Sequence, residues 1–256
     1  MHAIEPIGEP KDGHNMAAMN EFPFPKSLVA TAYRQLRSDI VAGKLKPGSR
    51  LRVEHLKERY KVGAGTLREA LSLLVADLLV VSQDQRGFRV APISLADFRD
   101  ITETRAMLEA EALRQSIRNA NDEWEGELVS AFHLLRLAEE RTERSDSQTL
   151  IDYEVSNRRF HTALLRNCPS HWTKHFVSVL YRQSERYRRL SLANPPPKRD
   201  VHAEHATIFE AALAHDSEAA AAALADHITQ TYRVISALTD SMNFEGVETT
   251  ASYTGS

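Results

Sequence analysis

The sequence has a single cysteine and no long apolar run, and each absence excludes a class of protein. Cys168 is the only cysteine among 256 residues, which excludes a disulfide within the chain and a cluster of thiolate metal ligands. No apolar stretch approaches the ~20 residues that span a bilayer, so we do not expect this chain to be a membrane protein. The first 25 residues carry acids, proline and glycine where a signal peptide has a basic start and an apolar core. We therefore expect a cytoplasmic location.

The small net charge of −3 conceals opposite charges in the two halves of the chain. Residues 26–95 contain 13 Lys and Arg against 6 Asp and Glu, a net of +7. Residues 96–256 contain 18 against 25, a net of −7. A basic segment joined to an acidic one predicts that only the first binds a polyanion, although a basic surface can also serve solubility alone.

The first half of the chain has the pattern of a winged helix-turn-helix. Apolar residues at helical spacing predict a helix from 27 to about 41. A short helix over 53–60, a glycine-rich turn at 61–65 and a longer helix after it make a helix-turn-helix. Two apolar, β-branched runs around a polar turn then predict a β-hairpin, which forms the wing. We assign residues 27–93 to this domain.

Strand signals end at Ser94, and amphipathic helices follow. They are predicted near residues 95–119, 122–143, 147–167, 170–192, 200–214 and 217–239. Their predicted N-caps include Asp122, Ser147, Ser170 and Ser217. The predicted fold class is mainly α: an N-terminal winged helix-turn-helix with a small β-hairpin wing, then an all-α helical bundle over 94–240. We predict a flexible arm at 1–26 and a disordered tail at 241–256.

Both halves resemble known families. The first half resembles the winged helix of GntR-type transcription regulators through Leu36-Arg37…Leu45-Lys46-Pro47-Gly48…Leu51, Leu67-Arg68-Glu69-Ala70-Leu71 and Arg86-Gly87-Phe88-Arg89-Val90. The second half is similar to the FCD class of effector domain, whose signature positions fall on Arg105, Glu109, Asn157, Phe160, His161, Glu204, His205 and His227. The resemblance covers roughly residues 27–238. It implies a homodimeric regulator that binds a double-stranded DNA operator and a small-molecule effector.

Two departures from the family patterns bear on function. The turn before the recognition helix reads Val62-Gly63-Ala64, where the family has Val-Ser-Arg, so a hydroxyl cap and an arginine are missing. Asn157 stands where the family has a metal-binding aspartate. The first departure predicts an altered sequence preference, because an arginine bidentate to guanine contributes about 1–3 kcal/mol of discrimination.

The predicted DNA contacts lie on the helix-turn-helix and the wing. The start of the second helix enters the major groove in this motif, which brings Arg68 to base edges unless it pairs with a nearby acid. Arg37 resembles the family's phosphate-contacting arginine. Arg and Gly at a wing tip suit the minor groove. The full set is Arg37, Arg52, Gly65, Thr66, Arg68, Arg86 and Gly87. One such domain reads a half-site, which favours a homodimer.

Three histidines and an amide form the predicted metal site. Asn157 and His161 are four residues apart and share one helix face. His205 and His227 lie at similar distances from the turn that joins the last two helices, so they are level with one another. Such a set suits a divalent transition ion, Zn, Ni or Mn, with binding weakened because Asn157 replaces an anion. The alternative is a group of buried, hydrogen-bonded histidines without an ion.

The predicted effector is a small organic acid anchored by the metal. Arg105 is positioned to supply a bidentate partner to its carboxylate, or else to pair with Glu109. A basic run at Arg182, Arg186, Arg188 and Arg189 predicts a solvated helix face.

The sequence thus predicts a metabolite-responsive repressor rather than an enzyme. One alternative is a metal-dependent hydrolase, although no His-Glu-x-x-His motif is present. Others are a non-specific DNA-binding protein with a vestigial effector domain, and a helical module that has lost DNA binding through Gly63 and Ala64.

Overall fold

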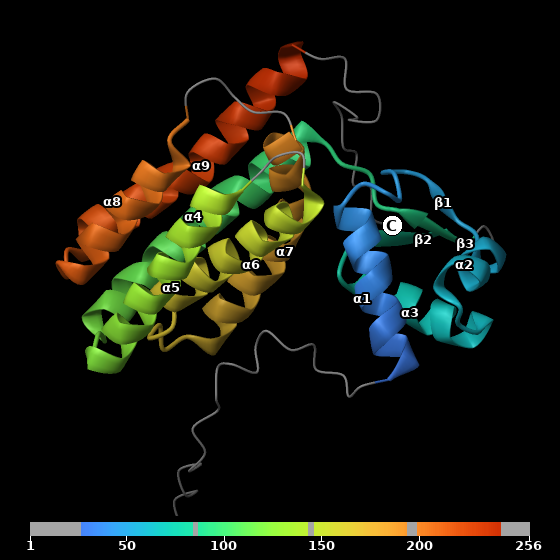
Figure 1. Cartoon of the computed structure of the whole chain (residues 1–256), viewed down its shortest axis with the longest axis horizontal. Helices are drawn as coiled ribbons and strands as arrows, with labels where there is room; N and C mark the ends of the chain where they lie inside the picture. Colours follow the sequence, from blue (N-terminus) through green and yellow to red (C-terminus); the bar gives the residue numbers. More distant parts are fainter. Residues whose placement is uncertain (1–26, 84–86, 143–145, 194–198, 242–256) are drawn as a thin grey trace, which may run out of the picture.

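The computed structural model describes residues 27–83, 87–142, 146–193 and 199–241. A small winged domain lies beside a larger helical bundle (Figure 1). The winged domain contains α1 (Leu28–Val41), β1 (Arg50–Leu51), α2 (Val53–Tyr60), α3 (Ala64–Ala76), β2 (Val80–Gln83) and β3 (Gly87–Val90). The bundle contains α4 (Leu95–Arg118), α5 (Asp122–Arg141), α6 (Ser147–Leu164), α7 (His171–Ala193), α8 (Val201–Leu213) and α9 (Ser217–Ser241). The predicted fold class is confirmed.

The winged domain is held together by leucines from three helices and by a small sheet. Leu36 of α1 and Leu67 and Leu71 of α3 are fully buried in one core. The sheet is antiparallel with the order β1-β3-β2, and β3 pairs with β2 from Val80 opposite Val90. The sequence predicted the hairpin, and the structure adds β1 as a third strand.

The turn before α3 uses a lysine rather than a glycine for its left-handed residue. Lys61 has φ 53°, whereas Gly63 has φ −67° and is the N-cap of α3. Glycine carries no oxygen, so α3 begins without a side-chain cap, as the missing hydroxyl predicts. The glycine-rich turn is therefore in the predicted place, but the residue that reverses the chain is Lys61.

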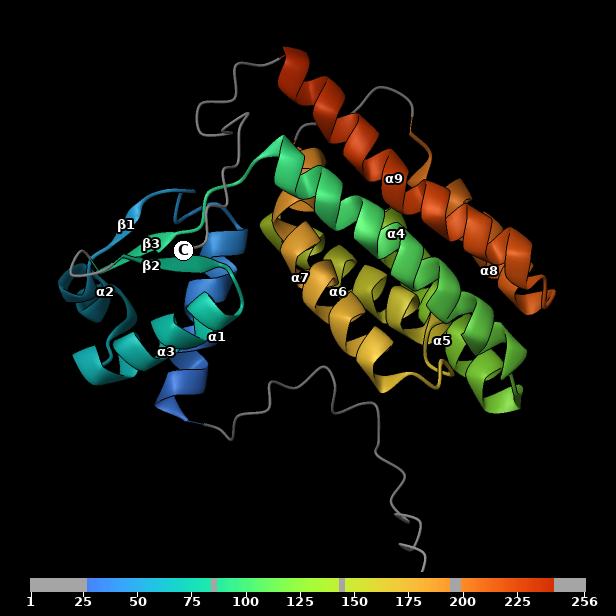
Figure 2. The ribbon, with the colours of Figure 1, turned by 180° about the vertical axis from the view of Figure 1, so that it is seen from behind.

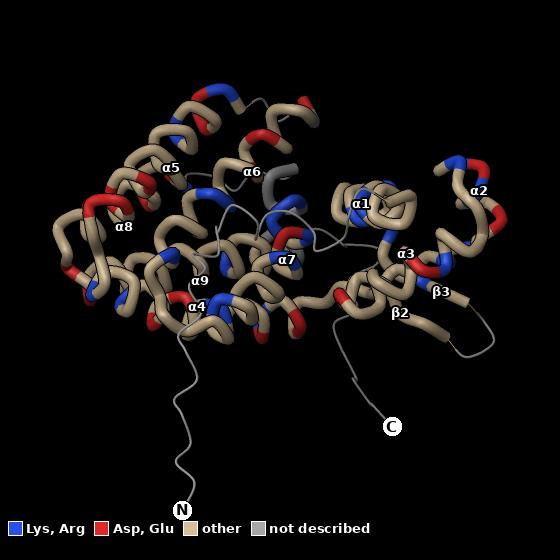
Figure 3. Tube along the Cα trace, turned by 90° about the horizontal axis from the view of Figure 1, so that it is seen from below, with Lys and Arg blue, Asp and Glu red and all other residues tan. Residues whose placement is uncertain are grey.

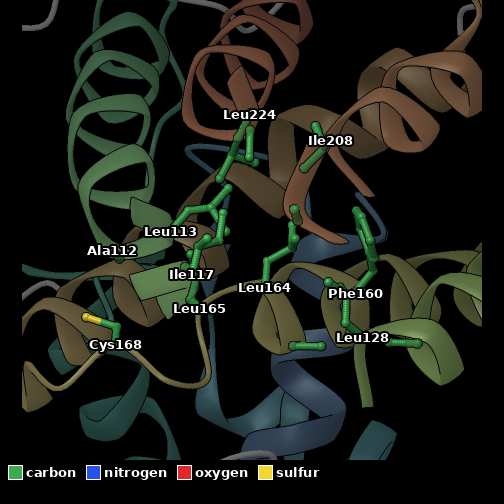
Figure 4. Close-up of a cluster of buried hydrophobic side chains, with 14 of the residues drawn as sticks. Ala112, Leu113, Ile117, Leu128, Phe160, Leu164, Leu165, Cys168, Ile208 and Leu224 are labelled. Atoms are coloured by element: carbon green, nitrogen blue, oxygen red, sulfur yellow. The ribbon is translucent and has the colours of Figure 1, made fainter. Parts of the chain in front are cut away.

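The bundle packs α4 between α7 and α9, with α5 on α6 and α8 on α9 (Figure 2). Its core contains buried leucines from four helices together with Phe160 and Ile208 (Figure 4). The predicted cap at Ser170 is confirmed by its bond from the backbone N–H of Thr173. The other three predicted caps are wrong by one residue, because the capping side chains belong to Asn121, Asp146 and Asp216.

A third, smaller core lies where the two domains meet. Phe98 of α4 stacks on Tyr187 of α7 with 4.3 Å between ring centroids, and Ile93 and Ile235 pack around them. The Tyr187 hydroxyl also accepts from the backbone N–H of Ser94, the N-cap of α4. The segment between the wing and α4 is therefore fixed against α7. Within the described ranges, none of the helices is long and apolar enough to cross a membrane.

Candidate metal centre and nucleic-acid interface

Three histidines from three helices meet inside the bundle. His161 of α6, His205 of α8 and His227 of α9 are all buried, and each offers a ligand atom within 4.8 Å of the others. An ion about 2.1 Å from each nitrogen would hold two of them at most about 4.2 Å apart. Small ring movements thus suffice for coordination, and the predicted convergence of these side chains is confirmed.

Each histidine has a glutamate beside its Nδ1 atom. Glu139 of α5 lies 2.7 Å from Nδ1 of His205, and Glu204 lies 2.7 Å from Nδ1 of His227. Nδ1 of His161 lies 3.5 Å from Glu109 of α4. The Nδ1 of His161 has no hydrogen-bond partner among the described residues. At His205 and His227 a carboxylate bound to Nδ1 fixes the ring and leaves Nε2 for a metal, which is the usual outer shell of a histidine metal site.

Burial favours the neutral form of two of the imidazoles, as metal ligation requires. Burial lowers the pKa of His161 to about 4, against the opposing effect of Glu109. Burial and the neighbouring His205 also place the pKa of His227 well below its usual value. Burial alone would raise the pKa of Glu109, but Arg105 and His161 outweigh it and lower that pKa to about 2. The His161 and His227 rings are therefore neutral and have lone pairs available for a metal.

Two orphaned polar atoms fit a metal in this place. The Nδ2 of Asn157 donates to the Tyr181 hydroxyl at 2.8 Å. Its Oδ1 and the Nε2 of His205 are buried and have no hydrogen-bond partner among the described residues. Buried polar atoms without a partner are costly, and a metal bound by both atoms would satisfy them. The donor set of three imidazoles and one amide oxygen fits Zn²⁺, Ni²⁺ or Mn²⁺.

Arg105 is engaged with protein groups. Its Nε donates to Glu109 at 2.7 Å and its Nη1 donates to Ser184 at 2.8 Å, and both charged side chains are buried. The structural pairing weighed for Arg105 is thus present. Its guanidinium lies 4.8 Å from the centroid of the Tyr181 ring, beside the residue that holds Asn157.

The prediction of a solvated basic face on α7 is wrong. Arg188 pairs with Glu154 at 2.9 Å and its side chain is 12% exposed. Arg186 is buried and donates to the backbone carbonyl of Ala91 at 2.7 Å. These cations pair with acids and carbonyls of other elements, which a pattern within one helix does not reveal.

Among the described residues, most of the predicted DNA contacts on α2, α3 and the wing are open to solvent. Arg68 and Gly65 are exposed near the start of α3, and Thr66 is half-buried between them. The Arg68 guanidinium forms no ion pair with any described acid, so the alternative of a paired surface arginine is not seen. Arg52 is exposed at the N-cap of α2 without a capping bond. Figure 3 shows basic segments along α1, α2 and β3 of this domain.

The remaining predicted contacts differ in their surroundings. Gly87 begins β3 with φ +83°, a conformation that suits glycine at the end of the wing loop. Arg86 lies outside the described residues, as do the predicted arm at 1–26 and residues 242–256 of the predicted tail. Arg37 faces the bundle, where its Nη2 is 2.5 Å from Oε2 of Glu185 on α7.

Sequence reasoning missed the groups that surround the histidine cluster. Glu139 and Tyr181 belong to no motif in the sequence, and each contacts a predicted ligand through tertiary packing. Glu204 was part of the quoted signatures but received no role there, and Glu109 was considered only as a partner of Arg105. Acids beside each candidate ligand can be found only once the arrangement of the helices is known.

Two family models together match most of the chain. Residues 28–90 match the model for bacterial regulatory proteins of the gntR family. Residues 100–230 match the model for the FCD domain.

Relatives and solved structures agree with these matches. The chain is 50% identical over 210 residues to the uncharacterized HTH-type transcriptional regulator BphR of Paraburkholderia xenovorans (strain LB400), covering 82% of this chain and 86% of the relative. It is 34% identical over 200 residues to the HTH-type transcriptional repressor GlaR of Escherichia coli (strain K12), covering 77% and 90%. The E. coli McbR/YncC structure has a TM-score of 0.68 at 21% identity, covering 84% and 100%, and supports the fold alone.

Proposed function

Because this chain belongs to the GntR family of transcription regulators, with an FCD effector domain after its winged helix-turn-helix, we propose that it is a metabolite-responsive repressor. It binds an operator through α3 and the wing, as a homodimer on two half-sites. We propose repression because the 34% identical relative GlaR is named as a repressor.

The effector in this proposal is a small organic acid held at the histidine cluster. His161, His205, His227 and the Oδ1 of Asn157 would hold a divalent transition ion. Such an ion supplies vacant positions for a carboxylate. The single observation that carries the proposal is the set of three buried histidines, two of which have a glutamate 2.7 Å from Nδ1. Asn157 adds no negative charge, so metal affinity is lower than a carboxylate at that position would give.

The effector acts by binding one of two domain arrangements more tightly than the other. Arg105 remains the proposed partner of the effector carboxylate, which would then compete with Glu109 for the guanidinium. The hydrolase alternative has less support, since the relatives reported above are transcription regulators.

A binding experiment on the DNA upstream of the protein's own gene tests the proposal. We expect this fragment to bind more tightly than an unrelated duplex of equal length, and metabolic carboxylates to change the affinity. Arg68→Ala should weaken operator binding about tenfold, since a base contact contributes about 1–3 kcal/mol. Arg99→Ala is a matched control, because Arg99 is an exposed arginine of the bundle paired with Glu103. Equal binding to both duplexes would contradict sequence-specific regulation.

A further inference from the structure

The C-terminal half of α7 contacts the winged domain through neighbouring side chains. Gln183 donates to the backbone carbonyl of Asp77 at the end of α3, and Arg186 donates to a carbonyl in the segment before α4. Between them, Glu185 binds Arg37 of α1. Helix α7 of the effector domain is therefore bonded to α1 and to the end of α3, the predicted recognition helix.

The pair of Arg37 and Glu185 is largely closed to solvent. The two side chains are 13% and 11% exposed, with 2.5 Å between Nη2 and Oε2. Burial alone would raise the pKa of Glu185, but Arg37 and Arg158 outweigh it and lower the pKa. The pair is thus a charge-assisted hydrogen bond between ionised groups, of the kind that arginine also makes with phosphate.

Glu185 is connected on its other side to the metal centre. Arg158 follows Asn157 in α6, and its Nη2 lies 3.4 Å from Oε2 of Glu185. The Arg158 guanidinium also lies 5.3 Å from the centroid of the Tyr181 ring. Tyr181 precedes Glu185 by about one turn of α7 and accepts the hydrogen bond of Asn157. Movement of Asn157 or Tyr181 would therefore act on the side chains that hold Glu185.

We propose that Glu185 is an autoinhibitory residue whose carboxylate occupies Arg37 in place of a DNA phosphate. The inference rests on the proposed function, because it takes Arg37 as a phosphate contact. A guanidinium that is bonded to Glu185 and faces the bundle does not reach DNA. The observed arrangement is consequently one of low DNA affinity, and separating the pair adds one phosphate contact.

Phosphate contacts are independent of base sequence, so a generic duplex is a sufficient probe. The full chain is titrated into a fluorescent 30-bp duplex of random sequence at several salt concentrations, and binding is followed by anisotropy. Glu185→Gln keeps the size of the side chain and removes its charge. We expect about tenfold tighter binding at low salt, and a plot of log K against log salt that is steeper by about 0.9 for the added phosphate.

Two further variants separate release of Arg37 from other effects. Arg37→Gln should cancel the gain of Glu185→Gln in the double variant, and alone should weaken binding less than twofold, since Arg37 is already occupied. Gln183→Ala breaks the neighbouring contact to the winged domain without touching Arg37, and its salt dependence should equal that of the wild type. The single Arg37→Gln measurement tests the inference even where Glu185→Gln fails to fold.

Each contrary result has its own meaning. An unchanged affinity for Glu185→Gln overturns the inference, as does a gain of equal size in the Arg37→Gln background or in Gln183→Ala. A tenfold loss for Arg37→Gln alone also overturns it, because Arg37 would then already contact DNA in the wild type. Wild-type protein that binds no duplex DNA at low salt would overturn the proposed function itself.

Discussion

Glu139 lies 2.7 Å from a ring nitrogen of each of two histidines, of which one is the fully buried His205 and the other the exposed His202. It binds Nδ1 of His205, whose Nε2 is buried without a partner among the described residues. The Glu139 carboxylate is therefore as much a part of the site as the His205 ring. Sequence alone identified the ring, through resemblance and helical spacing, but a carboxylate from a distant helix leaves no local pattern.

Glu139→Gln tests the role of this carboxylate. We expect Zn²⁺ affinity, measured by competition with a chelating indicator, to fall about 10- to 100-fold, because outer-shell partners orient and activate their ligands. Glu140→Gln is the control: Glu140 is the next residue, is exposed, and pairs with Arg136 on the same helix. Equal affinities for both variants would mean that His205 needs no orienting carboxylate.

At the scale of helices, the sequence predicted which helices exist and in what order. It predicted the residues at which they begin and end less well. Each helix of the bundle begins and ends within a few residues of its predicted bounds, because apolar spacing and breaks in the chain are local signals. The caps were less predictable, since Asn121 and Asp122 both suit the position by residue type. The structure selects Asn121, whose Oδ1 accepts from the backbone N–H of Trp124 at 2.9 Å.

The two neighbours at the start of α5 give a stability prediction. Asn121→Ala removes the cap and should lower the free energy of unfolding by about 1 kcal/mol. Asp122→Ala removes only a charge near the helix N-terminus and should cost about 0.5 kcal/mol or less. Urea denaturation followed by circular dichroism measures both. A larger loss for Asp122→Ala would assign the cap to the residue that the sequence suggested.

On the scale of the whole molecule, the charge asymmetry of the sequence predicted two parts with different roles, but not how they join. The join depends on Tyr187, Glu185 and Arg186 of α7. These residues read as ordinary polar positions of a surface helix. Their partners are 90 or more residues away in the chain, beyond the reach of any local pattern.

The proposed homodimer gives a prediction at this scale. Large apolar side chains remain exposed on the bundle, including Met107 of α4 and Trp172 and Phe176 of α7, at 66%, 67% and 52%. Contiguous exposed apolar groups often mark an interface, and the rings of Trp172 and Phe176 stack with 6.0 Å between their centroids. Sedimentation velocity at micromolar concentration should therefore give a species of about twice the 28.8 kDa chain mass. A monomer both with and without DNA would remove the dimer.

The central claim of this account is that a metal ion binds at the three histidines, since the proposed effector depends on it. Metal content of the purified protein, measured by mass spectrometry, tests this claim most directly, with His205→Ala as the variant and the exposed His175→Ala as its control. We predict about one transition ion per chain in the wild type and in His175→Ala, and none in His205→Ala. No ion in the wild type after incubation with Zn²⁺, Ni²⁺ or Mn²⁺ would contradict the claim.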